Sequence, residues 1–242
     1  MPKSYKGRGV VLSTVKYGDS SMVAQLLTDV GGRQSFMVQG VRSTRGRGSK
    51  LALFQPLFAL EFEGAEPTRG ELHRFREVHS GITLHKTPFD VRRSTIALFI
   101  AEVLYRLIKE SEANERLFEF VWGSVEALDN IEEGVANFHL WFLSNLTRVM
   151  GFSPTNNYSK GCWFDIKEGC YTSEKPLHNL LLDPDMAMIL RDMIECDVRH
   201  LGEVGLNRHQ RVSFLEALMS YYGYHLESIH SVQSISILME LF

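Results

Sequence analysis

The spacing of hydrophobic residues changes near residue 80, and this change constrains the fold more than any other feature of the sequence. Before it, apolar residues form short runs that alternate every second position between turns rich in Gly, Asp and Pro. After it, they recur at every third or fourth position, as in helices that face a core. The pattern predicts an α+β protein with two domains: a strand-rich domain over residues 1–80 and an all-helical domain over residues 81–242.

Five strands are expected in the first domain, over residues 9–15, 21–28, 33–41, 57–63 and 71–79. In the fourth strand, Phe58, Leu60 and Phe62 alternate with two glutamates, so one face is apolar and the other acidic. The fifth strand places four residues on one face, namely Leu72, Arg74, Arg76 and Val78. Five short strands in about 80 residues predict a small barrel, because closure removes exposed strand edges.

Helices are expected over residues 90–110, 115–128, 134–150, 185–195, 208–222 and 231–242. Pro88 and Asp90 mark the start of the first helix, and Gly151 follows the third as a residue typical of helix ends. Between the third and fourth helices, residues 152–179 lose periodicity and gather Pro, Asn, Gly and Ser. We therefore expect irregular structure over that segment.

The net charge of −3 hides an asymmetry along the chain. Residues 1–80 contain twelve Lys and Arg against seven Asp and Glu, a net charge of +5, whereas the remaining residues contain fourteen against 22, a net charge of −8. Such asymmetry indicates a part that binds a polyanion, joined to an acidic part. A chance distribution over a solvated surface is the alternative explanation.

The segment 41–50, VRSTRGRGSK, combines four cations with two glycines and no acid. Arginine binds phosphate through two hydrogen bonds, and glycine lets the backbone approach a ligand closely. The alternative is a solvated loop. If the strands close into a barrel, five further cations extend this patch, and the candidate contacts to a nucleic acid are then Lys6, Arg8, Arg33, Arg42, Arg45, Arg47, Lys50, Arg74 and Arg76. Aromatic residues of the same half are candidates for base stacking, although Phe36 and Phe75 fit the barrel core better.

The sequence gives no indication of an enzyme. The motifs G-x-x-x-x-G-K-[ST], H-E-x-x-H, G-x-S-x-G and G-x-G-x-x-G are all absent. Cys162, Cys170 and His178 suggest a zinc site, but the C-x₇-C spacing is long and a fourth ligand is missing. We therefore expect no metal, no other cofactor and free thiols.

Cellular location is predicted from the cysteines and the hydrophobic runs. Three cysteines are too few for a disulfide framework, and the first residues, MPKSYKGRGV, contain no apolar signal segment. No run of about 18 apolar residues is present, so no membrane span or membrane partner is expected. These features predict a reduced, cytoplasmic protein.

Residues 8–63 resemble the N-terminal domain of the RecO family of bacterial recombination mediators. In order, they contain a G-x-V-L strand start, a Y-G-(D/E)-S turn, a Gly-Gly hairpin, a basic Gly-containing loop and L-x-x-F-Q-P-L. Residues 211–241, RVSFLEALMSYYGYHLESIHSVQSISILMEL, resemble the closing helices of the family, where Tyr-x-x-x-His-Leu precedes a Ser-rich last helix. The resemblance therefore spans nearly the whole chain.

This resemblance implies an N-terminal OB-fold barrel followed by a helical domain, and a non-enzymatic role in DNA repair and homologous recombination. It further implies binding of single- and double-stranded DNA, annealing of complementary strands and association with the nucleoid. The implied partners are RecR, the acidic C-terminal tail of single-stranded DNA-binding protein and, indirectly, RecA. An RNA-binding or protein-interaction module with an incidental basic loop is the alternative.

The resemblance also implies a position for a metal module, because many members carry a four-cysteine zinc module between helical segments. Here only Cys162 and Cys170 remain within residues 152–179. We therefore predict that the fold of this module persists without metal.

Overall fold

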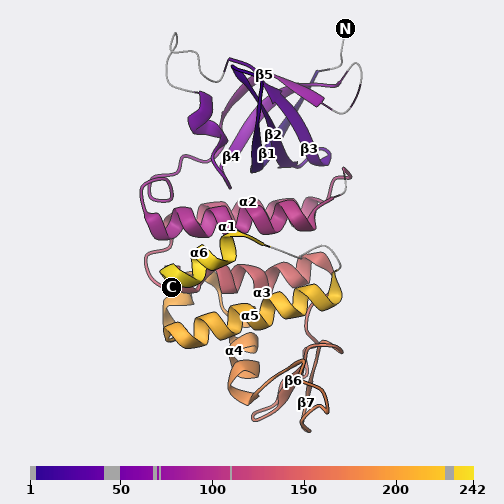
Figure 1. The fold of residues 1–242 in the computed structure, drawn as a ribbon, viewed down its shortest axis with the longest axis vertical. Helices are drawn as coiled ribbons and strands as arrows, with labels where there is room; N and C mark the ends of the chain where they lie inside the picture. The colour runs from indigo at the N-terminus through magenta and orange to yellow at the C-terminus, as the bar shows by residue number, and fades with distance from the viewer. Residues whose placement is uncertain (1–3, 41–49, 68–69, 71, 110, 227–231) are drawn as a thin grey trace. The chain divides into compact units, whose positions relative to one another are not determined.

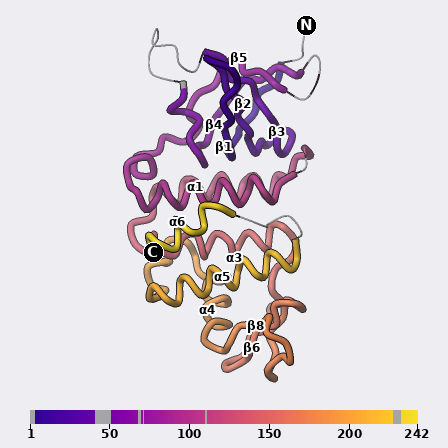
Figure 2. The backbone as a smooth tube through the Cα atoms, viewed as in Figure 1, coloured from indigo at the N-terminus to yellow at the C-terminus, as the bar shows by residue number. Residues whose placement is uncertain are grey.

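The computed structural model of the chain describes residues 4–40, 50–67, 70, 72–109, 111–226 and 232–242 (Figures 1 and 2). These residues form two compact units. The first contains residues up to Phe89 together with Ile100–Asp129, and the second contains Asp90–Phe99 and Asn130–Phe242. Helix α1 (Val91–Leu107) thus contributes residues to both units, and the domain boundary expected near residue 80 stays a prediction.

The first unit is built on a closed barrel of five strands: β1 (Ser4–Tyr17), β2 (Ser21–Thr28), β3 (Gly32–Val38), β4 (Ala59–Ala65) and β5 (Leu72–Ser80). β1 pairs antiparallel with both β2 and β4, and parallel pairing of β3 with β5 closes the barrel in the order β1-β2-β3-β5-β4. Five strands closed in this way form the OB fold. The predicted strands and the predicted barrel are therefore confirmed (Figure 1).

Aromatic side chains fill the barrel. Phe36 and Phe62 are buried, and the ring of Phe75 stacks on that of Phe36 at a centroid distance of 4.4 Å. The short 3-10 helix η1 (Lys50–Phe54) adds Phe54, which is also buried in this core. The inward orientation of Leu60 and Phe62 in β4 and the core positions expected for Phe36 and Phe75 are confirmed.

The face predicted for β5 is wrong for Val78. Between Phe75 and Glu77 the register of β5 against β4 shifts by one residue, which leaves Arg76 without an opposite residue. Such a bulge reverses the alternation of side chains along a strand. Val78 therefore packs against the barrel core, whereas Arg74 and Arg76 are exposed.

Helix α2 (Glu115–Asn130) lies beside the barrel in the first unit (Figure 1). Near its end, the Asp129 carboxylate accepts hydrogen bonds from the backbone N–H groups of His85, Lys86 and Thr87 at 2.8, 2.9 and 2.7 Å. Burial alone would raise the pKa of Asp129, but these three N–H groups lower it below its ordinary value. The contact fixes the segment that follows β5 to the helix.

The second unit packs α3 (Phe138–Met150) beside α5 (Arg208–His225), with α4 (Pro184–Glu195) against α3 and α6 (Ser234–Leu241) near the start of α5 (Figures 1 and 2). The helix expected from residue 134 begins as a 3-10 turn, η2 (Val135–Asn137), before α3. Gly151 ends α3 with a φ of 85°, as expected of a helix-terminal glycine. Asp183 caps α4 by accepting a hydrogen bond from the Met186 N–H at 2.9 Å.

Part of the segment expected to be irregular forms a small sheet in this unit. β6 (Trp163–Asp165) pairs with β7 (Cys170–Thr172) and with β8 (Leu181–Leu182). The rings of Phe164 and Tyr171 pack at 5.0 Å, and the Asn157 side-chain amide donates to the Tyr171 carbonyl at 2.8 Å. Aromatic packing and hydrogen bonds therefore hold this sheet together.

The second unit contains Cys162, Cys170 and Cys196. All three have free thiols. Cys162 is buried, whereas Cys170 and Cys196 are half-buried. Among the residues that the structure describes, no group of three or more His, Cys, Asp and Glu side chains is arranged to hold a metal ion. Over the same residues, no helix combines the length and the hydropathy needed to cross a membrane.

Candidate nucleic-acid interface

The nine cations predicted to contact a nucleic acid fall into three groups. Lys6, Arg8 and Arg76 lie on the side of the barrel formed by β1, β4 and β5. Arg33 and Arg74 lie on the two strands that close the barrel. Arg42, Arg45 and Arg47 lie outside the described residues, and Lys50 is described only by the backbone at the start of η1.

The β1–β4–β5 side mixes its cations with acids. Lys6 and Arg8 line a hollow of about 420 Å³ whose other lining residues include four carboxylates, those of Asp29, Glu61, Glu63 and Glu77. Lys6 lies opposite Glu63, and the Glu63 carboxylate also accepts a hydrogen bond from Arg76 at 3.4 Å. Carboxylates repel phosphates, so this side is poorly suited to a polyanion.

Arg8 is occupied by contacts within the first unit. Its Nε donates to the Asp29 carboxylate at 3.2 Å, and its guanidinium also donates to Glu119 of α2. The same guanidinium lies over the rings of Phe118 and Trp122 at 4.9 and 5.2 Å from their centroids. The hydrogen bond with Glu119 is the main cause of a raised pKa of Arg8. These contacts join β1 to α2, and DNA binding by Arg8 stays a prediction.

Arg33 has a similar position at the start of β3. It donates to the backbone carbonyl of Tyr105 at 3.0 Å, and its guanidinium lies 5.3 Å from the centroid of the Tyr105 ring. Leu27, which lies opposite Arg33 on β2, is buried. This end of the outer β2–β3 face is therefore covered by the second half of α1, which belongs to the same unit.

The other end of the outer β2–β3 face is open. Val23 and Met37 each lie between two residues of the barrel core, so their own side chains point outward. Val15 lies opposite Val23, Val23 opposite Met37, and Met37 opposite Arg74. Three apolar side chains therefore cross β1, β2 and β3 in one row that ends at a cation on β5, and Val15 is 58% exposed.

A second outward row runs beside the first. Ser13 lies opposite Gln25, Gln25 opposite Ser35, and Ser35 opposite Leu72, which is 37% exposed. This row adds two hydroxyl groups and one amide, which donate and accept hydrogen bonds. We call the two rows together, from Val15 to Arg74 and from Ser13 to Leu72, the open face.

The turn between β1 and β2 borders the open face. Tyr17 is 59% exposed there, and the neighbouring Lys16 is exposed as well. Lys16 lies opposite the core residue Met22, which in turn lies opposite Val38, so its side chain leaves β1 on the inner side of the barrel wall, at the rim of the open face, whereas Val15 points outward. The basic segment 41–50 follows β3 in the sequence and lies almost wholly outside the described residues. Sequence reasoning missed Lys16, although its place next to the Y-G-D-S turn was a usable signal.

The two sides of the barrel differ in charge. β2 and β3 contain no Asp or Glu, whereas β4 contains Glu61 and Glu63 and β5 contains Glu77. Within the described part of the chain, the exposed Arg74 forms no ion pair with a carboxylate. The open face therefore combines apolar side chains with hydrogen-bonding groups and cations at its borders. This combination suits a ligand with apolar rings and a negatively charged backbone.

Comparisons with known proteins agree with this fold. Residues 1–81 match the family model described as "Recombination protein O N terminal", and residues 88–232 match "Recombination protein O C terminal". The chain is 35% identical to the DNA repair protein RecO of Phocaeicola vulgatus and 36% identical to that of Bacteroides fragilis, in each case over 97% of both chains. It is 32% identical to the DNA repair protein RecO of Flavobacterium psychrophilum over 98% of both chains. The names of these relatives state a role in DNA repair and no enzymatic activity. The chain therefore belongs to the RecO family of DNA repair proteins.

Proposed function

We propose that this chain binds single-stranded DNA on the open face of the barrel and acts in repair by annealing complementary strands. The observation that carries the proposal is the contrast in charge, because the two central strands of the open face lack carboxylates while the β1–β4–β5 side contains several. OB folds bind oligonucleotides on the face of strands 2 and 3 and with the loop between strands 1 and 2. In this chain those elements carry Val23, Met37 and Tyr17.

In this proposal, bases lie on the apolar row, and phosphates are neutralised by Arg74, Lys16 and the cations of segment 41–50. Phosphate contacts carry no sequence information, so binding tolerates any sequence. The same contacts bind the backbone of double-stranded DNA. Two complementary strands repel each other, and neutralisation of one strand lowers the repulsion that opposes pairing. The step needs no catalytic residue and no nucleotide hydrolysis.

The proposed partners are those that the resemblance to the family implies. We propose that the chain cooperates with RecR, contacts the acidic tail of single-stranded DNA-binding protein and thereby helps to load RecA on coated DNA. A pull-down with a peptide that ends in this acidic tail tests the second contact. Retention of the chain at low salt is expected, and no retention would remove this partner.

An annealing assay tests the function itself. Two complementary oligonucleotides, one with a fluorophore and one with a quencher, are mixed with and without a coat of single-stranded DNA-binding protein. The chain is expected to accelerate annealing in both conditions. A DNA–DNA rate no greater than that without protein would refute the proposal, and acceleration confined to RNA strands would favour an RNA-binding function instead.

A further inference from the structure

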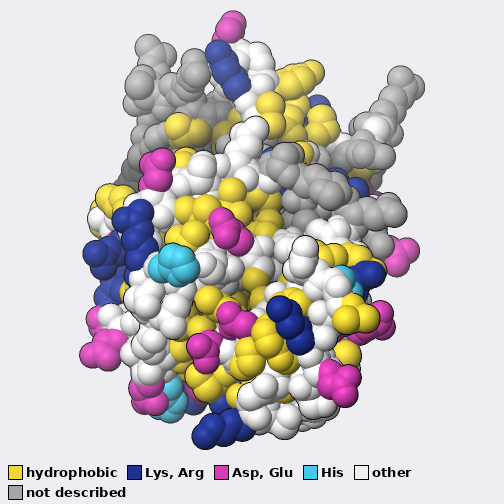
Figure 3. Space-filling model, turned by 60° about the horizontal axis from the view of Figure 1, so that its bottom comes forward, with side chains coloured by type: hydrophobic (Ala, Val, Ile, Leu, Met, Phe, Trp, Pro, Cys, Tyr) yellow, Lys and Arg dark blue, Asp and Glu magenta, His cyan; other side chains and the backbone are white. Residues whose placement is uncertain are grey.

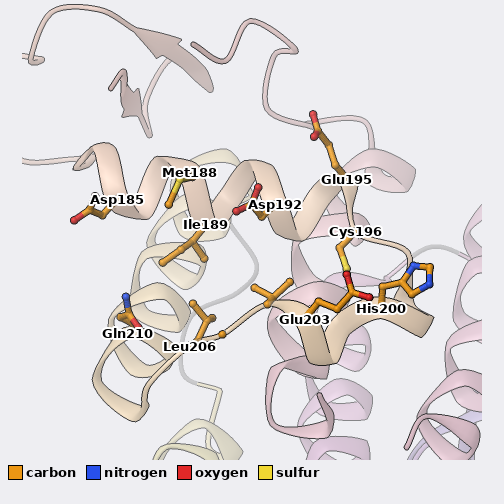
Figure 4. A pocket seen from close by; sticks show the side chains of 12 residues that line it. Asp185, Met188, Ile189, Asp192, Glu195, Cys196, His200, Glu203, Leu206 and Gln210 are labelled. Atoms are coloured by element: carbon orange, nitrogen blue, oxygen red, sulfur yellow. The ribbon is translucent and has the colours of Figure 1, made fainter. Parts of the chain in front are cut away.

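A groove of about 510 Å³ lies in the second unit, between α4, the 3-10 helix η3 (Val198–Glu203) and the residues that lead into α5. In Figure 4, Ile189 of α4 and Leu206 point toward each other across this groove. Asp185 lies at one end, and Glu203 lies at the other end beside His200 (Figure 4). The groove thus has an apolar middle and acidic ends.

The apolar middle is only partly covered by the chain itself. Met188 is 41% exposed, although its neighbour Ile189 is 5% exposed. Val204 and Leu206 are half-buried on the opposite wall. Figure 3 shows, on one face of the chain, exposed hydrophobic side chains with Asp and Glu side chains beside some of them. A large aliphatic side chain placed between Met188 and Leu206 would remove apolar surface from water on both walls.

The charge of the groove has one sign. Its lining residues include Asp185, Asp192, Glu195 and Glu203, and they include no Lys or Arg. Arg191 pairs with two of these acids and not with those at the ends, because its Nε lies 2.7 Å from the Asp192 carboxylate and 3.9 Å from that of Glu195. For Asp185 and Glu203, no ion pair is formed with any described residue.

The Cys196 thiol, which lines the groove, lies in the same negative potential. The pKa of the Cys196 thiol is raised, first by burial and then by the carboxylates of Asp197, Glu203 and Asp192. A negative potential of this kind repels DNA and repels an acidic peptide tail. It attracts a positively charged peptide.

We propose that this groove binds a basic segment of a partner protein, with an aliphatic side chain between Lys or Arg residues. The aliphatic side chain lies between Met188, Ile189 and Leu206, and the flanking cations meet Asp185 and Glu203. Apolar contact gives affinity, and the acidic ends select the sign of the partner. This interaction is independent of DNA binding, because the groove belongs to the second unit and the open face to the first.

Fluorescence anisotropy tests the proposal with a labelled peptide of the sequence Gly-Arg-Lys-Leu-Leu-Lys-Arg-Gly and the full-length chain. The double variant Asp185→Asn, Glu203→Gln is expected to weaken binding about tenfold, and Met188→Ser about threefold. The matched control, Glu168→Gln with Glu216→Gln, removes two exposed carboxylates of the same unit outside the groove and is expected to change the affinity less than twofold. Thermal unfolding of each variant establishes that it is folded.

Three results would overturn the proposal. The first is an absence of peptide binding by the unmodified chain at low salt. The second is an equal loss in the groove and control variants, which would assign binding to the general acidity of the unit. The third is concentration-dependent dimerisation that the groove variant abolishes, which would assign the groove to a second copy of the chain.

Discussion

Replacing Lys16 and Arg74 together by Ala tests which side of the barrel holds DNA. Both side chains are exposed and lie outside the barrel core, so the variant is expected to unfold at the temperature of the unmodified chain. For single strands, each neutralised phosphate contributes about 0.7 to the slope of log affinity against log salt. Loss of two contacts therefore lowers the slope by about 1.4, and the loss of affinity between 50 and 200 mM salt becomes about sevenfold smaller.

The measurement is the fluorescence anisotropy of a labelled oligo(dT) titrated with protein at several salt concentrations. The control variant, Lys6→Ala with Arg76→Ala, removes the same charge from the β1–β4–β5 side, where Glu63 lies next to both cations. Its slope is expected to match that of the unmodified chain. A lower slope in the control variant, with an unchanged slope in the Lys16 and Arg74 variant, would refute the assignment of DNA binding to the open face. It would indicate that DNA binds on the β1–β4–β5 side instead.

Four further predictions concern binding and stability. Replacing Arg42, Arg45, Arg47 and Lys50 by Ala is expected to weaken binding and to lower the salt slope by up to about 3, and an unchanged slope in a folded variant would remove this segment from the site. Arg8→Ala is expected to cost about 1–3 kcal/mol, because it removes two ion pairs and two ring contacts, and to lower the unfolding midpoint by roughly 3–10 °C while the salt slope stays constant. Burial lowers the pKa of His139 to about 3, whereas a histidine in the unfolded chain has a pKa of about 6.5. The free energy of unfolding therefore falls as the pH decreases between these two values, by up to about 1.4 kcal/mol per pH unit. Urea unfolding at pH 7 and pH 5 is expected to show a smaller loss of stability for His139→Leu than for the unmodified chain, and equal losses would contradict this cause. Asp129→Asn is expected to lower the free energy of unfolding by about 1–3 kcal/mol at pH 7, because it weakens the hydrogen bonds to residues 85–87. Because the pKa of Asp129 is lowered in the folded chain, the difference in stability between the variant and the unmodified chain is expected to shrink as the pH falls below about 4.

Local periodicity was sufficient to predict most of the elements. β2 has the predicted bounds, because the Y-G-D-S turn before it and the Asp and Gly residues after it interrupt the pattern on both sides. The helix end at Gly151 was predictable for the same reason, since it depends on the chemistry of one residue. The bulge at Arg76 was not predictable, because it arises from pairing with β4 rather than from the sequence of β5.

The site was harder to predict than the fold. A count of cations along the chain assigns Arg8 and Arg74 to the same site. However, Arg8 donates a hydrogen bond to Glu119, more than a hundred residues away, and no local sequence pattern predicts that contact. The same count omits Val15, Val23 and Met37, since apolar residues on a strand do not reveal which face stays exposed. The first point depends on α2, which carries Glu119. Closure of the barrel bears on the second, because it places β1 between an acidic strand and a strand without acids.

Photo-crosslinking tests the central claim most directly, because it reports contact rather than affinity. p-Benzoylphenylalanine is placed at Met37, on the open face, or at Glu61, on the β1–β4–β5 side, and each protein is irradiated with labelled oligo(dT). The open-face assignment predicts a crosslink from position 37 and none from position 61. A crosslink from position 61 alone would contradict it.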